Sequence, residues 1–512
     1  MKFILNICLL FNFLICSTLY FQADPFYLFD YEKQQFESAF FDNSLSLRPS
    51  FSNKNSSKSN LFYSSWYYYN DNAPNLENTS NKWIGKGSNY FKSIHYDFFN
   101  DFLYFSIEPY FFVSENLNFN PILNREGQPQ EHTDPIFLAL NNNRVHNENP
   151  FISSGLRESQ LIVHKNDFGI GFSNTNLWWG PGIHNSLHIS NNTTGFNYFY
   201  LGTNTTKRIN NFGYNFKYVF SKLDKNIYEP YYTGFAADIT YYGSMVTTFG
   251  FYRSFLSSSD ASIENLSIYD SMALPFQSLF KKTLTKQNNN IYAQDDVDQT
   301  LSIFVRSISK RNKFIIFFEY GWNDHRWDKY DFFQHPDHSG ASMIGFRKYN
   351  LFNNDNLLFG FEYTNLIKGK FSNRTGNSNW FDKEIYDYNK FEGRRFTAHI
   401  GADADDLMLY FGYISEIRDM IFYLNYERHG VIESIELSDF YDELLDNPFH
   451  VPEYKIEFKI DYRQSFKYFD AYLFYEFEYL DNIGIPIQDI NPRYNLPKNK
   501  SNVFGVGITK VF

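Results

Sequence analysis

The chain has almost no cysteine. Its two cysteines, Cys8 and Cys16, both lie in an apolar segment at the N-terminus of the 512 residues. We interpret that segment as a signal that is removed on export, so the mature chain would contain no cysteine. This excludes a disulfide-stapled fold, a metal site built on cysteine and a thiol nucleophile.

Long apolar runs, glycine and proline are also scarce. Mean hydropathy is −0.45, which is incompatible with a set of membrane-spanning helices of about 20 apolar residues each. The 27 glycines and 17 prolines are too few for collagen or for a disordered chain. The formal net charge of −11 argues against nucleic acid as a partner. Aromatic residues, by contrast, make up 21% of the chain.

The N-terminus has the pattern of an export signal. Lys2 precedes an apolar stretch that continues to Leu19. A basic start before a short apolar core is typical of a secretory signal peptide, and we assign it to residues 1–22. Residues 23–95 are interpreted as an N-terminal segment that forms either the first strands or a periplasmic plug.

Apolar and polar side chains alternate through the rest of the chain. Successive side chains of a β-strand point to opposite faces, so a period of two indicates a strand. Between residues 454 and 463, one face carries Tyr454, Ile456, Phe458, Ile460 and Tyr462, and the other carries Lys455, Glu457, Lys459, Asp461 and Arg463. Similar runs predict roughly fourteen to eighteen strands.

Many amphipathic strands fit either a soluble sandwich or propeller, or an outer-membrane barrel. The last predicted strand ends in Phe512, and Phe504, Val506 and Ile508 share its face. A terminal aromatic residue on such a strand resembles the assembly signal of outer-membrane barrels. Together with the aromatic strand faces and the export signal, this predicts an all-β fold, a transmembrane antiparallel β-barrel of the bacterial outer membrane. We expect an even number of roughly 16–18 strands over residues 96–512.

Motifs of catalysis are absent. No HExxH, GxSxG or P-loop spacing occurs, and residues 169–171 lack the third glycine of a dinucleotide loop. The aspartates at 403–406 fit an acidic hairpin tip better than a calcium loop. We therefore predict no enzymatic activity, no cofactor and no metal site.

The first of two polar segments spans residues 177–202. It contains Trp178 and Trp179, a tight turn at Gly180-Pro181-Gly182, and then His184, Asn185, Asn191 and Asn192. Aromatic rings stack on sugar faces, and amide and imidazole groups pair with hydroxyls, which predicts a carbohydrate site. In the alternative, the tryptophans fill the barrel interior and the asparagines satisfy backbone groups.

The second polar segment spans residues 323–339. Its candidate ligand-binding residues are Asp324, His325, Asp331, His335 and His338. These side chains could ligate a divalent metal, but histidine spacings of ten and three match no tight ligand rule. Because the polar groups of both segments would be unfavourable in lipid, we predict that the two segments face one polar cavity.

At these segments the chain resembles the capsule assembly Wzi family of outer-membrane proteins. The resemblance extends from about residue 75 to the C-terminus and rests on residues 83–87, 108–109, 179–182, 185–187, 190–192, 318–321, 323–325, 331, 335–339, 362–364 and 426–429. The chain departs from the family pattern at Thr193-Thr194 and over residues 380–395.

The resemblance implies a barrel of roughly eighteen strands and a lectin-like role in holding or organising capsular polysaccharide at the cell surface. The expected partners are capsular or extracellular polysaccharide, outer-membrane lipid and, during biogenesis, the barrel assembly machinery. A porin-like channel for small solutes is the alternative.

Overall fold

The structure is a computed structural model of the whole chain. It describes residues 25–40, 45–49, 58–72, 77–117, 150–226, 228–258, 266–287, 297–367, 369, 380, 386, 389–392, 394–431, 452–481 and 498–512. The signal peptide predicted at residues 1–22 lies outside the described residues.

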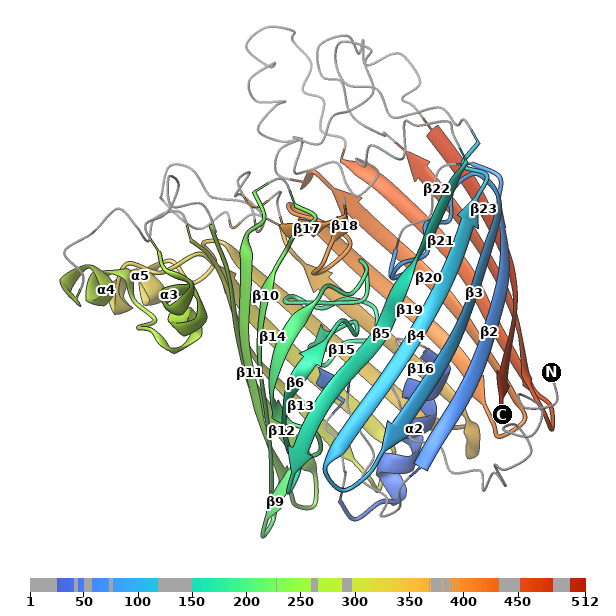
Figure 1. Cartoon of the computed structure of the whole chain (residues 1–512), viewed down its shortest axis with the longest axis horizontal. Helices are drawn as coiled ribbons and strands as arrows, with labels where there is room; N and C mark the ends of the chain where they lie inside the picture. Colours follow the sequence, from blue (N-terminus) through green and yellow to red (C-terminus); the bar gives the residue numbers. More distant parts are fainter. Residues whose placement is uncertain are drawn as a thin grey trace, which may run out of the picture.

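A closed antiparallel β-barrel dominates the molecule (Figure 1). Its wall is formed by β2 (Lys58–Asn70), β3 (Gly87–Phe99), β4 (Leu103–Ser114), β5 (Phe151–Lys165), β6 (Phe168–Ser173), β8 (Tyr198–Thr203), β9 (Lys207–Ile209), β10 (Phe212–Lys222), β11 (Tyr231–Tyr242), β12 (Val246–Ser257), β13 (Asp298–Ser309), β14 (Phe314–Asn323), β15 (Gly340–Leu351), β16 (Asn354–Asn365), β19 (Ala404–Ile414), β20 (Arg418–His429), β21 (Glu453–Ser465), β22 (Asp470–Asp481) and β23 (Lys498–Val511).

The described wall contains eighteen strands. β8 and β9 pair with different parts of β10, so these two short segments form one interrupted strand. The barrel closes where the last strand, β23, pairs antiparallel with the first wall strand, β2. The predicted fold class is confirmed, with a strand number that is even and at the top of the predicted range.

The barrel begins earlier in the chain than residue 96. Both β2 and β3 belong to the wall, which moves its start to Lys58. The reason is the run Trp66-Tyr67-Tyr68-Tyr69 in β2, whose aromatic residues occupy both faces and obscure the period of two. The N-terminal segment also contributes α2 (Pro25–Glu37), a helix inside the barrel near the end that carries the short β15–β16 and β19–β20 turns (Figure 1).

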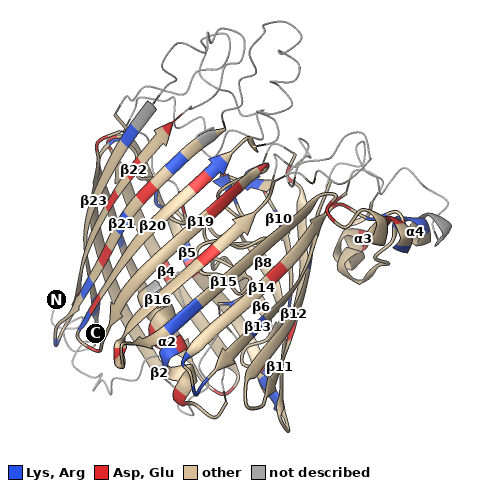
Figure 2. Ribbon diagram, turned by 180° about the vertical axis from the view of Figure 1, so that it is seen from behind, with Lys and Arg blue, Asp and Glu red and all other residues tan. Residues whose placement is uncertain are grey.

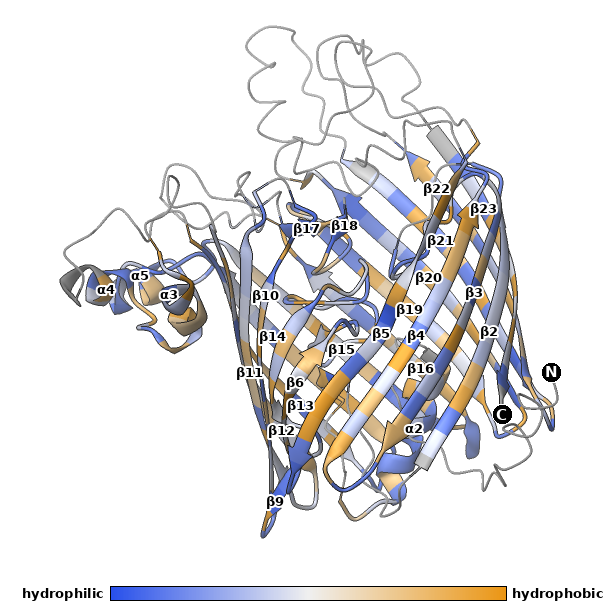
Figure 3. Cartoon of the chain, viewed as in Figure 1, coloured by the Kyte–Doolittle hydropathy of each residue, from blue (hydrophilic) through white to orange (hydrophobic). Residues whose placement is uncertain are grey.

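The predicted strand faces are confirmed in β21. Ile456 and Phe458 are 41% and 37% exposed on the outer wall, whereas Lys455 and Glu457 are buried toward the lumen. Figure 3 shows the same alternation as changing hydropathy along most strands. An apolar outer face and a polar inner face are typical of barrels that span a membrane.

Several short elements lie inside the wall with α2. β1 (Leu47–Arg48) pairs with β7 (Trp178–Trp179), and β17 (Lys390–Phe391) pairs with β18 (Arg394–Arg395). These inner segments pack on the inward side chains of the wall and form apolar clusters with them.

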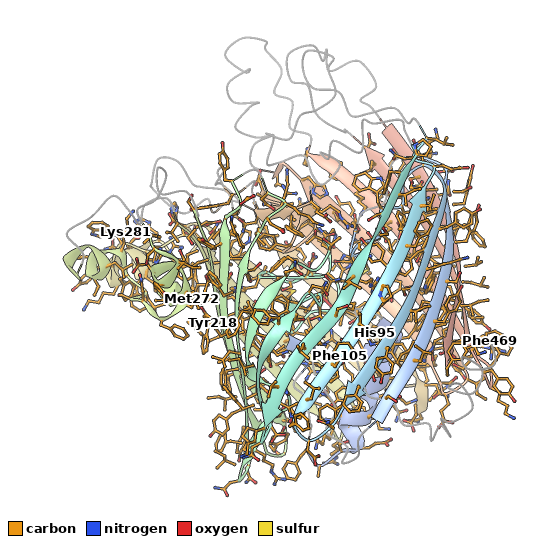
Figure 4. All side chains as sticks on the ribbon, viewed as in Figure 1. His95, Phe105, Tyr218, Met272, Lys281 and Phe469 are labelled. Carbon is orange, nitrogen blue, oxygen red and sulfur yellow. The ribbon has the colours of Figure 1, made fainter. Side chains whose placement is uncertain are left out.

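A small helical layer lies outside the wall, next to β11 and β12. This shelf consists of α3 (Ile268–Ala273), η1 (Leu274–Phe276), α4 (Lys281–Gln287) and α5 (Lys329–Gln334). Figure 4 labels Met272 and Lys281 on it, and the Tyr218 hydroxyl on β10 donates a 2.9 Å hydrogen bond to the Met272 carbonyl. None of the helices in the described ranges is long and apolar enough to cross a membrane.

Candidate functional site

The tryptophan pair predicted to bind sugar is buried inside the barrel. Trp178 is 3% exposed and Trp179 is 0% exposed. The Arg48 guanidinium lies 4.4 Å from the ring centre of Trp178, and the ring of Trp179 packs near Tyr252. A Cβ at Gly234 would come within 2.7 Å of the Trp179 ring, so the wall uses glycine to admit it. This packing supports the alternative in which the pair fills the interior.

Two of the three predicted asparagine ligands, Asn191 and Asn192, connect inner segments to one another. The Asn192 carboxamide accepts a 3.0 Å hydrogen bond from the Asn78 amide and donates one of 2.9 Å to the Arg395 carbonyl. The Asn191 carboxamide donates to the Asn78 carbonyl at 3.1 Å. Both side chains are buried, which again supports backbone satisfaction rather than an open sugar site.

His184 and Asn185 point toward the wall at Asp406. His184 Nε2 lies 2.9 Å from Asp406 Oδ2, and the Asn185 amide donates to the same oxygen at 2.6 Å. Asp406 lies within β19 and is 1% exposed, so it is not at an acidic hairpin tip, and that prediction is wrong. Burial alone would lower the pKa of His184, but the charge and hydrogen bond of Asp406, with the nearby Glu362 and Glu427 carboxylates, together outweigh burial and raise the pKa to about 9.

A compact histidine and carboxylate cluster forms around this pair. It consists of His184, His399, Asp406 and Glu427, whose ligand-type atoms all lie within 4.8 Å of one another. His399 Nε2 is 3.3 Å from Glu427 Oε1 and 3.8 Å from Asp406 Oδ2. Two members come from inner segments and two from the neighbouring wall strands β19 and β20, which carry red acidic bands in Figure 2.

The sequence prediction missed His399 and Glu427. A signal for Glu427 exists, because it belongs to residues 426–429, which carry part of the family resemblance. No local pattern marks His399, which is brought to the wall only by the inner hairpin of β17 and β18. The local β19–β20 hairpin, closed by a short turn, places Asp406 opposite Glu427.

A second buried charge network holds helix α2 against the wall. Glu32 Oε1 lies 3.0 Å from Arg306 and 2.8 Å from Arg347, and the Tyr349 hydroxyl donates to its other oxygen at 2.7 Å. Burial alone would raise the pKa of Glu32, but the two arginines hold it below its ordinary value. The neighbouring Glu362 carboxylate accepts the amide of Ile183 at 2.7 Å, which ties the tryptophan segment to the same network.

The second predicted segment does not share this cavity. His325 packs beside Arg253 and Phe255, which face the shelf outside the wall. The alternate residues Tyr252 and Ser254 face inward, where Ser254 contacts His188. Because neighbouring residues of a strand point to opposite faces, the two segments lie on opposite sides of β12. The prediction of one common cavity is wrong.

The remaining candidates of that segment form local contacts on the shelf. Asp331 lies in α5 and its carboxylate accepts the Trp327 amide at 3.0 Å. Asp324 accepts the His325 amide at 2.7 Å, and the His335 amide donates to the Asp331 carbonyl at 3.0 Å. His338 offers its carbonyl to the guanidinium of Arg326. Burial, with the nearby positive charge of Arg253, lowers the pKa of His325 to about 3, so this imidazole is neutral.

Comparison with known proteins supports the fold. No protein family and no curated protein matches the sequence. Among solved structures, the chain is similar to Wzi of Escherichia coli, described as a carbohydrate-binding β-barrel of the outer membrane involved in group 1 capsule assembly. The identity is 10% and the TM-score 0.57, over 94% of this chain and 97% of Wzi.

Two further structures are matched with lower scores. OprD of Pseudomonas aeruginosa is 7% identical with a TM-score of 0.42, over 89% of this chain and 95% of OprD. OccAB4 of Acinetobacter baumannii is 12% identical with a TM-score of 0.40, over 90% and 100% of the two chains. The similarity to Wzi, at 10% identity, concerns the outer-membrane barrel fold alone.

Proposed function

We propose that this protein is an outer-membrane barrel that binds or organises capsular or extracellular polysaccharide at the cell surface. The observation that carries the proposal is the packed interior. Phe29, Trp179, Leu187 and Phe396 come from three inner segments, and each is 0–2% exposed. A channel for solutes needs a continuous aqueous path, whereas a packed lumen suits a rigid scaffold that presents a binding surface.

Buried hydrogen bonds join the inner segments to one another. Arg48 donates to the Gly182 carbonyl at 2.8 Å, and Ser190 donates to the Thr397 carbonyl at 2.7 Å. Breaking such buried polar contacts is costly, so the inner segments are expected to stay in place rather than swing aside for solutes. The similarity to a carbohydrate-binding barrel supports the same function.

The burial of Trp178 and Trp179 changes where the glycan is expected to bind. Other described residues of the protein cover both rings. We therefore assign the two tryptophans to packing between the inner segments and not to stacking on sugar. The proposed glycan surface is then the end of the barrel where the β17–β18 hairpin lies, opposite α2 (Figure 1). The shelf is set against the outer wall, where its exposed Tyr269 and Phe333 suit contact with membrane lipid.

The test compares a deletion strain with a complemented strain and measures cell-bound and released polysaccharide. We expect deletion to shift polysaccharide from the cells to the medium. The purified folded barrel should also bind the immobilised polysaccharide and pass little current in a planar bilayer. Normal retention of polysaccharide together with steady, solute-dependent conductance would instead establish the porin-like alternative.

A further inference from the structure

Two buried carboxylates lie side by side on adjacent strands of the barrel wall. Asp406 on β19 and Glu427 on β20 are direct cross-strand partners, and both are 1% exposed. Like charges in this arrangement destabilise a sheet unless positive charge lies between them. Burial makes the requirement stricter because water cannot screen the pair.

The permanent positive charge nearby is shared by several carboxylates. Lys455 Nζ lies 3.1 Å from Glu427 and 3.2 Å from Glu457, and it also contacts Glu77. With Glu478 at 3.8 Å, the one Lys455 ammonium is shared by four carboxylates before Asp406 is considered. Within the described part of the chain, Asp406 Oδ1 and His399 Nδ1 have no hydrogen-bond partner, although both side chains are buried.

From this cluster, we propose that His184, His399, Asp406 and Glu427 bind one divalent transition-metal ion with the ligand preferences of zinc. Two imidazole nitrogens and two carboxylate oxygens suit zinc, whereas calcium and magnesium prefer all-oxygen sites. The ion would add positive charge between the facing carboxylates.

The spacing of the four groups fits such an ion. Metal–ligand bonds of about 2.0–2.2 Å place tetrahedral ligand atoms about 3.3–3.6 Å apart. The distances are 2.9 Å for His184–Asp406, 3.3 Å for His399–Glu427 and 3.8 Å for His399–Asp406. These values bracket the tetrahedral spacing, so small side-chain rotations suffice to complete the site.

The ion would join the segment that contains His184 to residues 399–427, which are more than 200 positions away in the chain. His184 follows β7 and His399 follows β18, and both belong to inner segments, while Asp406 and Glu427 belong to the wall. A bound metal would therefore fasten the inner segments to β19 and β20. Because it binds the folded chain and not the separated ligands, it should also raise the thermal stability of the barrel.

The experiment uses the full-length folded barrel in detergent, treated with a chelator and then dialysed against Zn²⁺ alone. Elemental analysis should find one zinc ion per chain, and a competing chromophoric chelator gives the affinity. We expect His399→Ala and Asp406→Asn each to weaken binding at least about 100-fold, since even changes in the outer shell cost about 10–100-fold. His325→Ala, on the shelf, is the matched control and should bind as the unmodified protein does.

A second measurement uses only the unmodified protein. X-ray absorption on the zinc-loaded unmodified protein should show two imidazoles and two oxygen ligands, and this holds even if a variant fails to fold. A folded barrel that takes up less than one ion per chain would overturn the proposal. So would a zinc environment without imidazole, or folded His399→Ala protein that retains full affinity.

Discussion

Glu32 on the inner helix α2 lies 2.8 Å from Arg347 on wall strand β15, although the two residues are 315 positions apart in the chain. Both side chains are buried. The same carboxylate also pairs with Arg306 on β13. This contact docks the helix to two non-adjacent strands of the wall, and it makes the stability of the barrel interior depend on one acidic side chain.

Glu32→Gln should destabilise the folded barrel strongly. The substitution removes the carboxylate charge and leaves the guanidinium groups of Arg306 and Arg347 buried without their anionic partner. Removing one partner of a buried ion pair costs about 3–5 kcal/mol. Urea unfolding in detergent micelles measures the change. Glu37→Gln at the exposed end of the same helix is the matched control and should have little effect. Equal stability of the two variants would contradict the docking role of Glu32.

The same contact predicts a pH dependence. The pKa of Glu32 is raised by burial but held below its ordinary value of 4.5 by Arg347 and Arg306. Because the folded pKa is lower than the unfolded one, the stabilisation is complete above pH 4.5 and declines as the pH falls toward the lowered value. Urea midpoints measured on both sides of that pH should fall for the unmodified protein. Glu32→Gln should lack this part of the slope, and an identical slope in the two proteins would refute the assignment.

Trp179→Ala should reduce the amount of folded barrel. The ring is fully buried against Gly234 and Tyr252, and removing a buried tryptophan costs about 3–5 kcal/mol through lost burial and the cavity left behind. Heat-modifiable migration on gels measures the folded fraction. Trp327→Ala, at a position that is 46% exposed on the shelf, is the control and should fold normally. Normal folding of Trp179→Ala with release of polysaccharide would instead restore Trp179 as a sugar contact.

The wall could be predicted from the sequence because its strands obey a local rule. In β21 successive side chains point alternately to the lipid and to the lumen. The faces on which Lys455 and Phe458 lie could therefore be predicted from the neighbouring residues alone. The interior could not be predicted in this way. β1 and β7 pair across more than a hundred residues, and His399 meets Glu427 only after two inner segments have folded.

The sequence of residues 177–202 is compatible with two different roles. Flat rings beside asparagine and histidine suit either a sugar site or a packed plug, and the two cases differ only in what covers the rings. The residues that pack on the rings include Arg48 and Gly234, which are distant in sequence from Trp178 and Trp179. Composition and spacing therefore identified the important segment but not its contacts.

Phe458→Arg tests the orientation of the wall in the membrane. Phe458 lies near the middle of β21 on the outer face, where an arginine would cost about 2–4 kcal/mol because lipid hydrocarbon cannot solvate its charge. Phe469→Arg is a matched control, since Phe469 is equally exposed at 37% but lies at the turn before β22, at the rim labelled in Figure 4. Near the interface the same change should cost only about 0–1 kcal/mol. Unfolding in lipid vesicles measures both variants. If the two lose the same stability, the middle of β21 does not face the hydrocarbon core, and the placement of the outer wall in the bilayer is wrong.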